Sequence, residues 1–267
     1  MYDEAGGQIH RGDGPILVAA PHVGTAIPEA LQALRAWRAV QETPVDPGGA
    51  RLQEAAAARG ISCVAARMHP CVIDVNMAAD RQSLASELGR SALCRPHSPS
   101  GERLYGGMAE LSEVEVMRRV RQYWQPYHDA LASELKRLRE IHDDVLLVVP
   151  HASSRLSPFQ HPSGASDCNV GTNRGASCDR LLVSTLTKSV KRGGRSWVVN
   201  GKLADAFAAQ HYGMPAAGMH VIELEIAGKW RAACEAAPVA ESTADEFDRL
   251  LGHLLDALST LANADGA

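Results

Sequence analysis

Short apolar runs alternate with longer amphipathic stretches along most of this chain of 267 residues. The apolar runs have the length and β-branched content of buried strands, and the amphipathic stretches have helical spacing. Expected strands cover residues 15–20, 62–68, 71–76, 144–151, 196–201 and 218–226. Expected helices cover residues 28–40, 51–60, 112–141, 176–190, 203–213 and 241–263. Strands that alternate with helices predict a three-layer α/β fold, with a central, mixed but mostly parallel sheet flanked by helices.

Single residues refine the limits of these elements. Gly60 is placed to end the second helix, because glycine favours the left-handed conformation that often follows a helix. Ser112 and Glu115 have the spacing of a capping box at the start of the long helix. Pro126 predicts a kink or a division inside that helix, since proline lacks the amide hydrogen that a helix interior needs. Residues 77–110 show no periodicity and predict a loop-rich segment.

Composition and charge narrow the class of protein. The chain is 45% hydrophobic and carries 27 basic and 31 acidic residues, so it lacks the basic excess of a nucleic-acid-binding protein. No apolar run approaches the roughly 20 residues that a membrane helix needs, and no secretory leader is visible. The six cysteines show no C-x-x-C spacing, which predicts free thiols. We therefore expect a cytoplasmic protein with one domain over residues 1–267.

Two of the expected strands run into the same short pattern. His22 ends the stretch "ILVAAPH" and His151 ends the stretch "LLVVPH", and small residues follow both. In open α/β sheets, ligands bind beyond the carboxyl ends of the strands. Histidine is the commonest metal ligand, and a catalytic zinc takes three protein ligands. The matching positions predict two ligands of one metal, although either histidine alone could simply hydrogen-bond to a loop.

Other polar residues also lie at the expected strand ends. Glu223 and Glu225 are two residues apart on one strand, so their side chains point to the same face. Because a half-buried carboxylate is costly without a partner, we expect one of them to serve a site, unless the strand is a solvated edge. Residues 166–180 form a turn rich in Gly, Asn and Asp before a helix, which is a weak signal for an anion site.

Nine short segments together resemble the N-formylglutamate amidohydrolases, a family with a zinc-carboxypeptidase-like α/β fold. They are "PHVGTAIP", "VIDVN", "LYGG", "YWQPYHDAL", "PHASS", "DCNVGTNRGASC", "VNGK", "HYGMPAAGMH" and "VIELEI", and they span about residues 15–230. Each is short, but their order and spacing agree with the family pattern. The resemblance implies a metal-dependent amidase of histidine catabolism that cleaves N-formyl-L-glutamate or a similar N-acyl amino acid.

The same resemblance implies roles for individual residues. His22, Asp46 and His151 correspond to ligands of a zinc or another divalent ion, and Asp46 stands five residues before "RL", as a family aspartate does. Glu225 takes the place of the general base that accepts a proton from the attacking water. The expected substrate-binding residues are Asn76, Arg67, Arg174, Asn200 and His128. The implied partner is a small N-acyl amino acid, and a homodimer is possible.

Several positions depart from the family pattern. Met77 stands where the family has an arginine, Pro70 replaces another arginine, and Val149 replaces the aspartate two residues before the second histidine. Ala204 and Gln210 replace a lysine and an arginine in the segment after "VNGK". Because arginine binds carboxylates in a bidentate manner, these losses weaken recognition of glutamate. We expect N-formylglutamate to be hydrolysed poorly and a less acidic or bulkier N-acyl substrate to be preferred.

Two further interpretations follow from these departures. Arg67, Arg81 or Arg174 could replace the missing cations. The chain could also be a degenerate family member that binds a small molecule without catalysis. The retention of Glu225 together with both histidines favours the hydrolase.

Overall fold

The structure is a computed structural model that describes residues 2–3, 7–41, 45–79, 93–105, 111–152, 166–236 and 240–265. An eight-stranded sheet forms its centre, in the order β1-β2-β4-β3-β5-β8-β6-β7. The strands are β1 (Tyr2–Asp3), β2 (Gly7–His10), β3 (Ile16–Ala20), β4 (Ser62–Ala66), β5 (Val145–Pro150), β6 (Cys168–Gly171), β7 (Trp197–Val199) and β8 (Met219–Ile226). Arg81, one of the candidate cations, lies outside the described residues.

The middle of the sheet is parallel and its margins are antiparallel. β3 pairs in parallel with β4 and β5, and β5 pairs in parallel with β8. β2 runs antiparallel to β4, and the parallel pair β6 and β7 runs antiparallel to β8. The central strands β3 and β5 are buried at every residue, which explains why their sequences are continuously apolar. The predicted mixed, mostly parallel sheet is confirmed.

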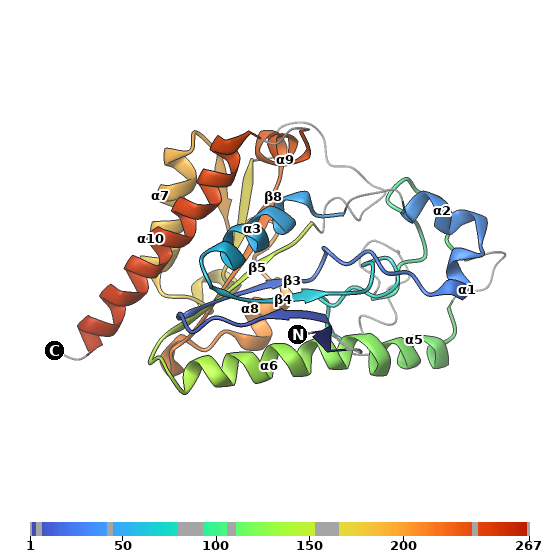
Figure 1. Ribbon diagram of the computed structural model, residues 1–267, viewed down its shortest axis with the longest axis horizontal. Coiled ribbons are helices and arrows are strands. Elements are labelled where there is room, and N and C mark those ends of the chain that lie inside the picture. Colours follow the sequence, from blue (N-terminus) through green and yellow to red (C-terminus); the bar gives the residue numbers. More distant parts are fainter. Residues whose placement is uncertain are drawn as a thin grey trace.

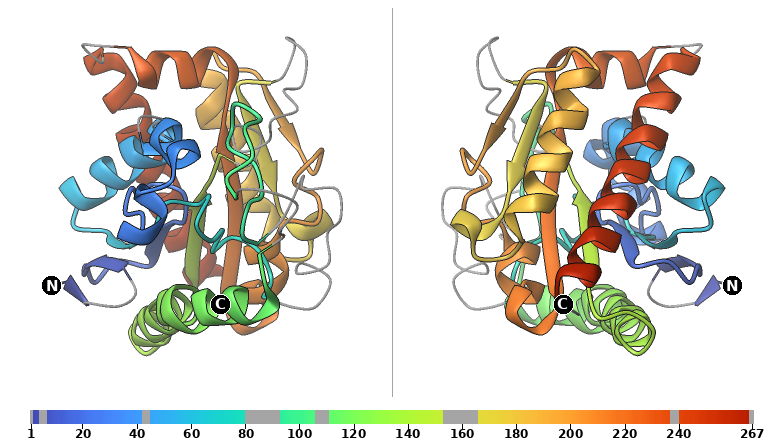
Figure 2. Two further views of the ribbon diagram at one scale, coloured as in Figure 1. Left: turned by 90° about the vertical axis from the view of Figure 1, so that its right-hand side faces the viewer. Right: turned by 90° about the vertical axis from the view of Figure 1, so that its left-hand side faces the viewer.

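Helices cover both faces of the sheet, as Figures 1 and 2 show. On one face α3, α7 and α10 share a buried core with Ile16, Val18 and Ile222, while α6 and α8 pack against Leu17 and Ala19 on the other. The helices are α1 (Glu29–Gln32), α2 (Arg35–Gln41), α3 (Pro47–Ala58), α5 (Glu113–Arg119), α6 (Gln125–Arg139), α7 (Arg180–Arg192), α8 (Phe207–Tyr212), α9 (Gly228–Glu235) and α10 (Glu241–Asp265).

The helix predicted over residues 112–141 is divided near Pro126, as expected. The division is a π-helical turn and not a kink at the proline itself. Ser112 caps α5 by accepting a hydrogen bond from the Glu115 N–H at 3.3 Å. A π-helical turn, Val120–Trp124, then joins α5 to α6, and Pro126 lies in the first turn of α6. The π turn therefore ends two residues before Pro126, and the helical chain continues from α5 into α6 without an intervening loop (Figure 1).

Two expected elements need correction, and some elements of the structure were not expected. The helix expected over residues 28–40 is two shorter helices, α1 and α2. Residues 71–76 were expected to form a strand, but they form turns. Their apolar side chains are buried, as in a strand, yet their carbonyl groups are bound by side chains of the long helix instead of by a neighbouring strand. The short strands β1, β2 and β6 and the helix α9 were not expected; β2 and β6 are only four residues long and each contains polar residues.

Candidate active site

The two strand-end histidines lie side by side. β3 and β5 are parallel neighbours, so their carboxyl ends reach the same edge of the sheet. The ring centroids of His22 and His151 are 6.0 Å apart, with the rings at 88° to one another. Both side chains are buried. The repeated strand-Pro-His pattern thus delivers two imidazoles to one place, which is the first requirement of the predicted site.

A buried carboxylate fixes the orientation of His22. The His22 Nδ1 accepts a hydrogen bond from the Ala152 N–H at 3.0 Å, so the proton is on Nε2, which donates to Asp74 Oδ1 at 2.8 Å. Arg95 donates to the other Asp74 oxygen at 2.8 Å. Burial works to raise the pKa of Asp74, but His22 and Arg95 together hold that pKa well below its usual value. Asp74 is therefore ionised and holds the ring of His22 in place.

Glu223 has the corresponding role beside His151. Its Oε2 is 3.2 Å from His151 Nε2 and accepts a hydrogen bond from Asn76 Nδ2 at 2.9 Å. Its Oε1 accepts from the Ala209 N–H at 2.9 Å. Burial opposes a charge on either side chain. Each partner nevertheless favours the charge of the other, so the pKa of Glu223 is lowered and the pKa of His151 is raised. Glu223, which lies opposite Val149 in the sheet, therefore provides an orienting carboxylate for His151.

Asp46 is a buried carboxylate with an unused oxygen. It stands at the N-terminus of α3, where its Oδ1 accepts a hydrogen bond from the Gly49 N–H at 2.9 Å. Among the described residues, its buried Oδ2 has no hydrogen-bond partner. Burial raises the pKa of Asp46, and this effect outweighs the Gly49 hydrogen bond and the nearby His22, His151 and Arg231, which all work to lower that pKa. An unsatisfied buried carboxylate oxygen near two imidazoles is costly for folding unless a cation or another ligand pairs with it.

Glu225 is the second carboxylate on the same face of β8. It is fully buried, and its Oε2 accepts a hydrogen bond from Asn169 Nδ2 at 3.0 Å. Asn169 lies directly opposite Glu225 in the antiparallel pair of β6 and β8. The Lys202 ammonium group forms an ion pair with the same oxygen, and its side chain remains 35% exposed. Glu225 is also close enough to His151 to raise the pKa of that histidine, and it pairs with a cation that reaches solvent.

The donor chemistry of this cluster fits a divalent ion of the zinc type. Two imidazoles and one carboxylate are a common ligand set for a catalytic zinc, and each imidazole has its own orienting carboxylate. The described residues do not include three such side chains already gathered in metal-binding geometry. The Ala152 N–H occupies Nδ1 of His22, so this nitrogen would exchange that hydrogen bond for the ion. The unused oxygen of Asp46 is the group that most needs the positive charge.

The structure brings some predicted substrate-binding residues to the cluster and separates others from it. Asn76 belongs to the cluster through Glu223. Arg174 does not, because its guanidinium donates two hydrogen bonds to Asp205 and both side chains are exposed. Asn200 lies in a left-handed turn, with φ 53°, and its amide binds Thr172. Asn200 therefore shapes the loop that carries Lys202.

His128 packs in the interior, where hydrogen bonds bind both of its ring nitrogens. Its Nδ1 accepts a hydrogen bond from the Tyr212 hydroxyl at 2.6 Å, and its Nε2 donates to the Val75 carbonyl at 2.9 Å. Trp124 packs against it, with ring centroids 3.9 Å apart and the rings tilted by 40°. Burial lowers the pKa of His128 to about 4, so the ring is neutral. With both nitrogens occupied, His128 supports the segment around Val75 and is not placed to bind substrate.

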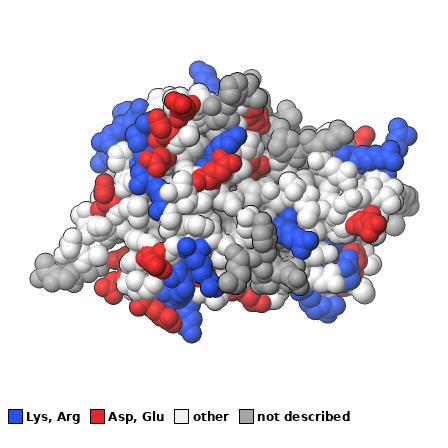
Figure 3. Space-filling model, viewed as in Figure 1, with Lys and Arg blue, Asp and Glu red and all other residues white. Residues whose placement is uncertain are grey.

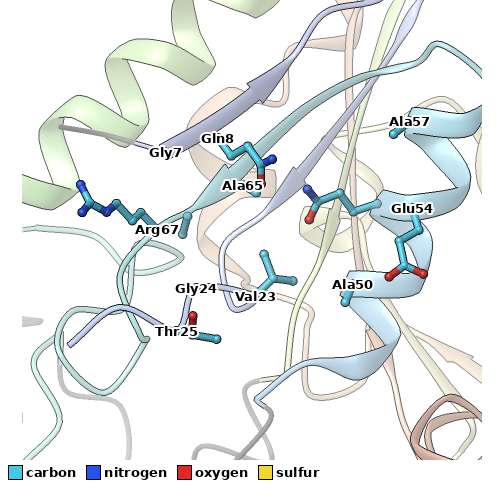
Figure 4. Close-up of a pocket in the computed structure, with 12 residues that line it drawn as sticks. Gly7, Gln8, Val23, Gly24, Thr25, Ala50, Glu54, Ala57, Ala65 and Arg67 are labelled. Carbon is cyan, nitrogen blue, oxygen red and sulfur yellow. The ribbon is translucent and has the colours of Figure 1, made fainter. Parts of the chain in front are cut away.

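Arg67 lines a groove of about 720 Å³ beside the cluster, shown in Figure 4. The groove lies between β2 and β4 on one side and α3 on the other. Val23 and Ala50 form part of its wall, and they lie close in sequence to His22 and Asp46. The groove is therefore lined by the turn that carries His22 and by α3, which begins directly after Asp46.

Four residues of the cluster were missing from the sequence-based set. Asp74 was visible inside "VIDVN", and Glu223 shares the face of Glu225, so both had a signal. Lys202 is part of "VNGK", which carried the resemblance but no assigned role. Arg95 lies in a segment without periodicity, and nothing in the sequence points to it.

Comparisons with known proteins show the family of this chain. The sequence profile of the N-formylglutamate amidohydrolase family matches residues 14–230. The N-formylglutamate deformylase of Pseudomonas aeruginosa is 34% identical over 219 residues, which are 81% of this chain and 82% of that protein. The chain belongs to the N-formylglutamate amidohydrolase family. The deformylase of Pseudomonas putida is similar, with 33% identity over 82% of both chains.

The fold of this amidohydrolase is also that of a solved family structure. The N-formylglutamate amidohydrolase from Ralstonia eutropha superposes with a TM-score of 0.69 at 22% identity, covering 96% of this chain and 97% of that chain. The family assignment makes the protein a hydrolase of linear amide bonds. In the described part of the chain, no helix combines the length and apolar character needed to cross a membrane. Basic and acidic side chains are interspersed on the face shown in Figure 3.

Proposed function

We propose that this amidohydrolase uses a bound divalent ion, zinc or a similar metal, to remove the formyl group from an N-formyl amino acid. His22, Asp46 and His151 would hold the ion, and Glu225 would act as the general base. The observation that carries the proposal is the unused, buried oxygen of Asp46 beside two imidazoles that two further carboxylates orient.

The chain's own residues would share the work of hydrolysis. When bound, the ion would polarise the formyl carbonyl and acidify the attacking water. Glu225 would take a proton from that water and deliver it to the nitrogen of the breaking C–N bond, which gives formate and the free amino acid. Asp74 and Glu223 would keep both imidazoles in position during this step. Lys202 would balance the charge of Glu225 and, because it reaches solvent, meet a carboxylate of the incoming substrate.

The names of the relatives suggest N-formylglutamate as the substrate. N-formylglutamate carries two carboxylates, and Met77, Ala204 and Gln210 stand at positions where the family pattern has cations or their neighbours. Lys202 pairs with Glu225 and Arg67 lines the groove, so we propose these two cations as partners for the substrate carboxylates. Because a buried carboxylate without a partner is costly, we expect less preference for the second carboxylate than in a glutamate-specific site.

Formate release from a panel of N-formyl amino acids tests this proposal. The protein is stripped with a chelator, reloaded with zinc and assayed on N-formylglutamate, N-formylleucine and N-formylmethionine. We expect hydrolysis that depends on the metal, and a kcat/KM for N-formylglutamate no higher than for the apolar substrates. A hundredfold preference for N-formylglutamate, about 2.7 kcal/mol, would contradict the specificity. Absence of hydrolysis of every N-acyl substrate would favour the non-catalytic binding protein.

A further inference from the structure

One short segment of chain contains the hydrogen-bond partner of His22 and contacts the carboxylate beside His151. Residues 71–77, here called the Asp74 segment, lie between β4 and the long helix. Asp74 accepts the hydrogen bond of His22, and Asn76 donates to Glu223, which contacts His151 at 3.2 Å. A shift of this segment would therefore move the two imidazoles together.

The Asp74 segment is held by side chains of the long helix. As turns, its residues leave carbonyl groups that strand pairing does not satisfy. Three side chains from α5, the π turn and α6 donate to these groups, which ties the segment to one rigid element at three points along its length. The three bonds run from Arg119 Nη1 to the Val72 oxygen at 2.9 Å, from His128 Nε2 to the Val75 oxygen at 2.9 Å, and from Trp124 Nε1 to the Met77 oxygen at 2.8 Å.

The π turn makes this arrangement possible. In a regular α-helix, residues five apart are rotated by about 140° and face different sides. In a π turn, the hydrogen bond runs between residues five apart, as it does here from the Gln125 N–H to the Val120 carbonyl. Arg119 and Trp124, which are five residues apart, are thereby brought toward one face, and His128 follows one α-helical turn later. An unbroken α-helix would turn Trp124 away from the segment that Arg119 holds.

We propose that Trp124, carried to this face by the π turn, is a positioning residue for His22 and His151. It touches neither histidine and acts through the Met77 carbonyl and the Asp74 segment. The inference rests on the proposed function only in giving the two histidines a catalytic role. The placement of their rings can be tested without metal or substrate.

The test compares two indole-to-phenyl substitutions. Trp124→Phe keeps an aromatic ring against His128 and removes the donor to the Met77 carbonyl. Trp37→Phe is the matched control, because the Trp37 Nε1 also donates to a backbone carbonyl, that of Leu104, at 3.0 Å. Trp37 packs in the same buried cluster as Val72, but its hydrogen bond does not reach the Asp74 segment. The ring nitrogen and proton signals of His22 and His151 are recorded by NMR in the metal-free proteins.

We expect both histidine signals to shift in Trp124→Phe and to stay in place in Trp37→Phe. In the zinc-loaded enzyme, kcat of Trp124→Phe should fall about tenfold while KM changes less than about twofold, because remote misplacement affects the reacting geometry more than binding. Unshifted signals in Trp124→Phe, or equal shifts in both variants, would overturn the inference. If wild type hydrolyses no N-formyl amino acid, the proposed function fails, and the NMR signals still decide the role of Trp124.

Discussion

Two buried carboxylates at opposite ends of the sheet have very different surroundings. Glu134 lies near the start of β4, and its Oε1 accepts from the Ser62 hydroxyl and from Arg137, both at 2.7 Å. Asp46 lies near the strand-end histidines, and within the described chain only one of its oxygens is hydrogen-bonded. Burial works against both charges, but the donors lower the pKa of Glu134, whereas the pKa of Asp46 is raised.

The difference separates a structural group from a functional one. A buried carboxylate whose oxygens are all bonded can strengthen the fold, because its partners replace water. A buried carboxylate with an open oxygen costs stability, and a chain that keeps it gains something else. Under the proposed function, Asp46 and the two neighbouring imidazoles would hold a divalent ion, and the positive charge of that ion would offset this cost. The following substitutions test this contrast.

Loss of a histidine from the cluster should have the largest effect. His151→Ala removes one candidate ligand and leaves Glu223 with its bonds to Asn76 and Ala209. We expect zinc binding to disappear and kcat/KM for an N-formyl amino acid to fall at least about a thousandfold, or about 4 kcal/mol. Metal analysis and steady-state kinetics measure both. A variant that keeps a tenth of the wild-type activity would remove His151 from the site.

Substitution of the proposed base should affect catalysis alone. Glu225→Gln keeps the size of the side chain and an oxygen that can accept from Asn169. Because general bases typically contribute a factor of about 10² to 10⁴, kcat should fall within that range while zinc remains bound. The same variant binding less than half of the wild-type zinc would show that Glu225 belongs to the ligand set instead.

Substitution at the opposite end of the sheet should affect stability alone. Glu134→Gln weakens the bonds with Ser62 and Arg137, and at pH 7 it should lower the free energy of unfolding by about 1–3 kcal/mol. The folded-state pKa of Glu134 lies below its unfolded value, so the wild-type advantage is present above about pH 4.3 and disappears as the pH falls through the folded-state pKa. Urea unfolding at several pH values measures this. We expect kcat to stay unchanged. A tenfold loss of kcat in Glu134→Gln would contradict the contrast between Glu134 and Asp46.

Sequence reasoning found the parts of the site that depend on strand ends. His22 and His151 could be predicted because an apolar run followed by Pro-His repeats in the chain, and parallel strands bring such ends together. Asp46 followed only from the family resemblance, and its open oxygen is visible only in three dimensions.

The misplaced residues share a physical cause. The strand expected at residues 71–76 was wrong because burial selects the same apolar residues in a strand and in a covered turn. His128 was assigned to substrate binding from the family resemblance, and in the structure hydrogen bonds in the interior bind both of its ring nitrogens. The π turn adds one residue to a helical turn, and a periodicity blurred by Pro126 does not reveal it.

A zinc titration of wild type and of Asp46→Asn tests the central claim most directly. Asparagine is as good a helix N-cap as aspartate, so the variant should keep α3 and its melting temperature while it loses the charge. We predict that metal-stripped wild type binds about one equivalent of zinc and that Asp46→Asn binds it at least about tenfold more weakly. Equal affinities in the two proteins, or less than about a tenth of an equivalent in folded wild type, would contradict the account.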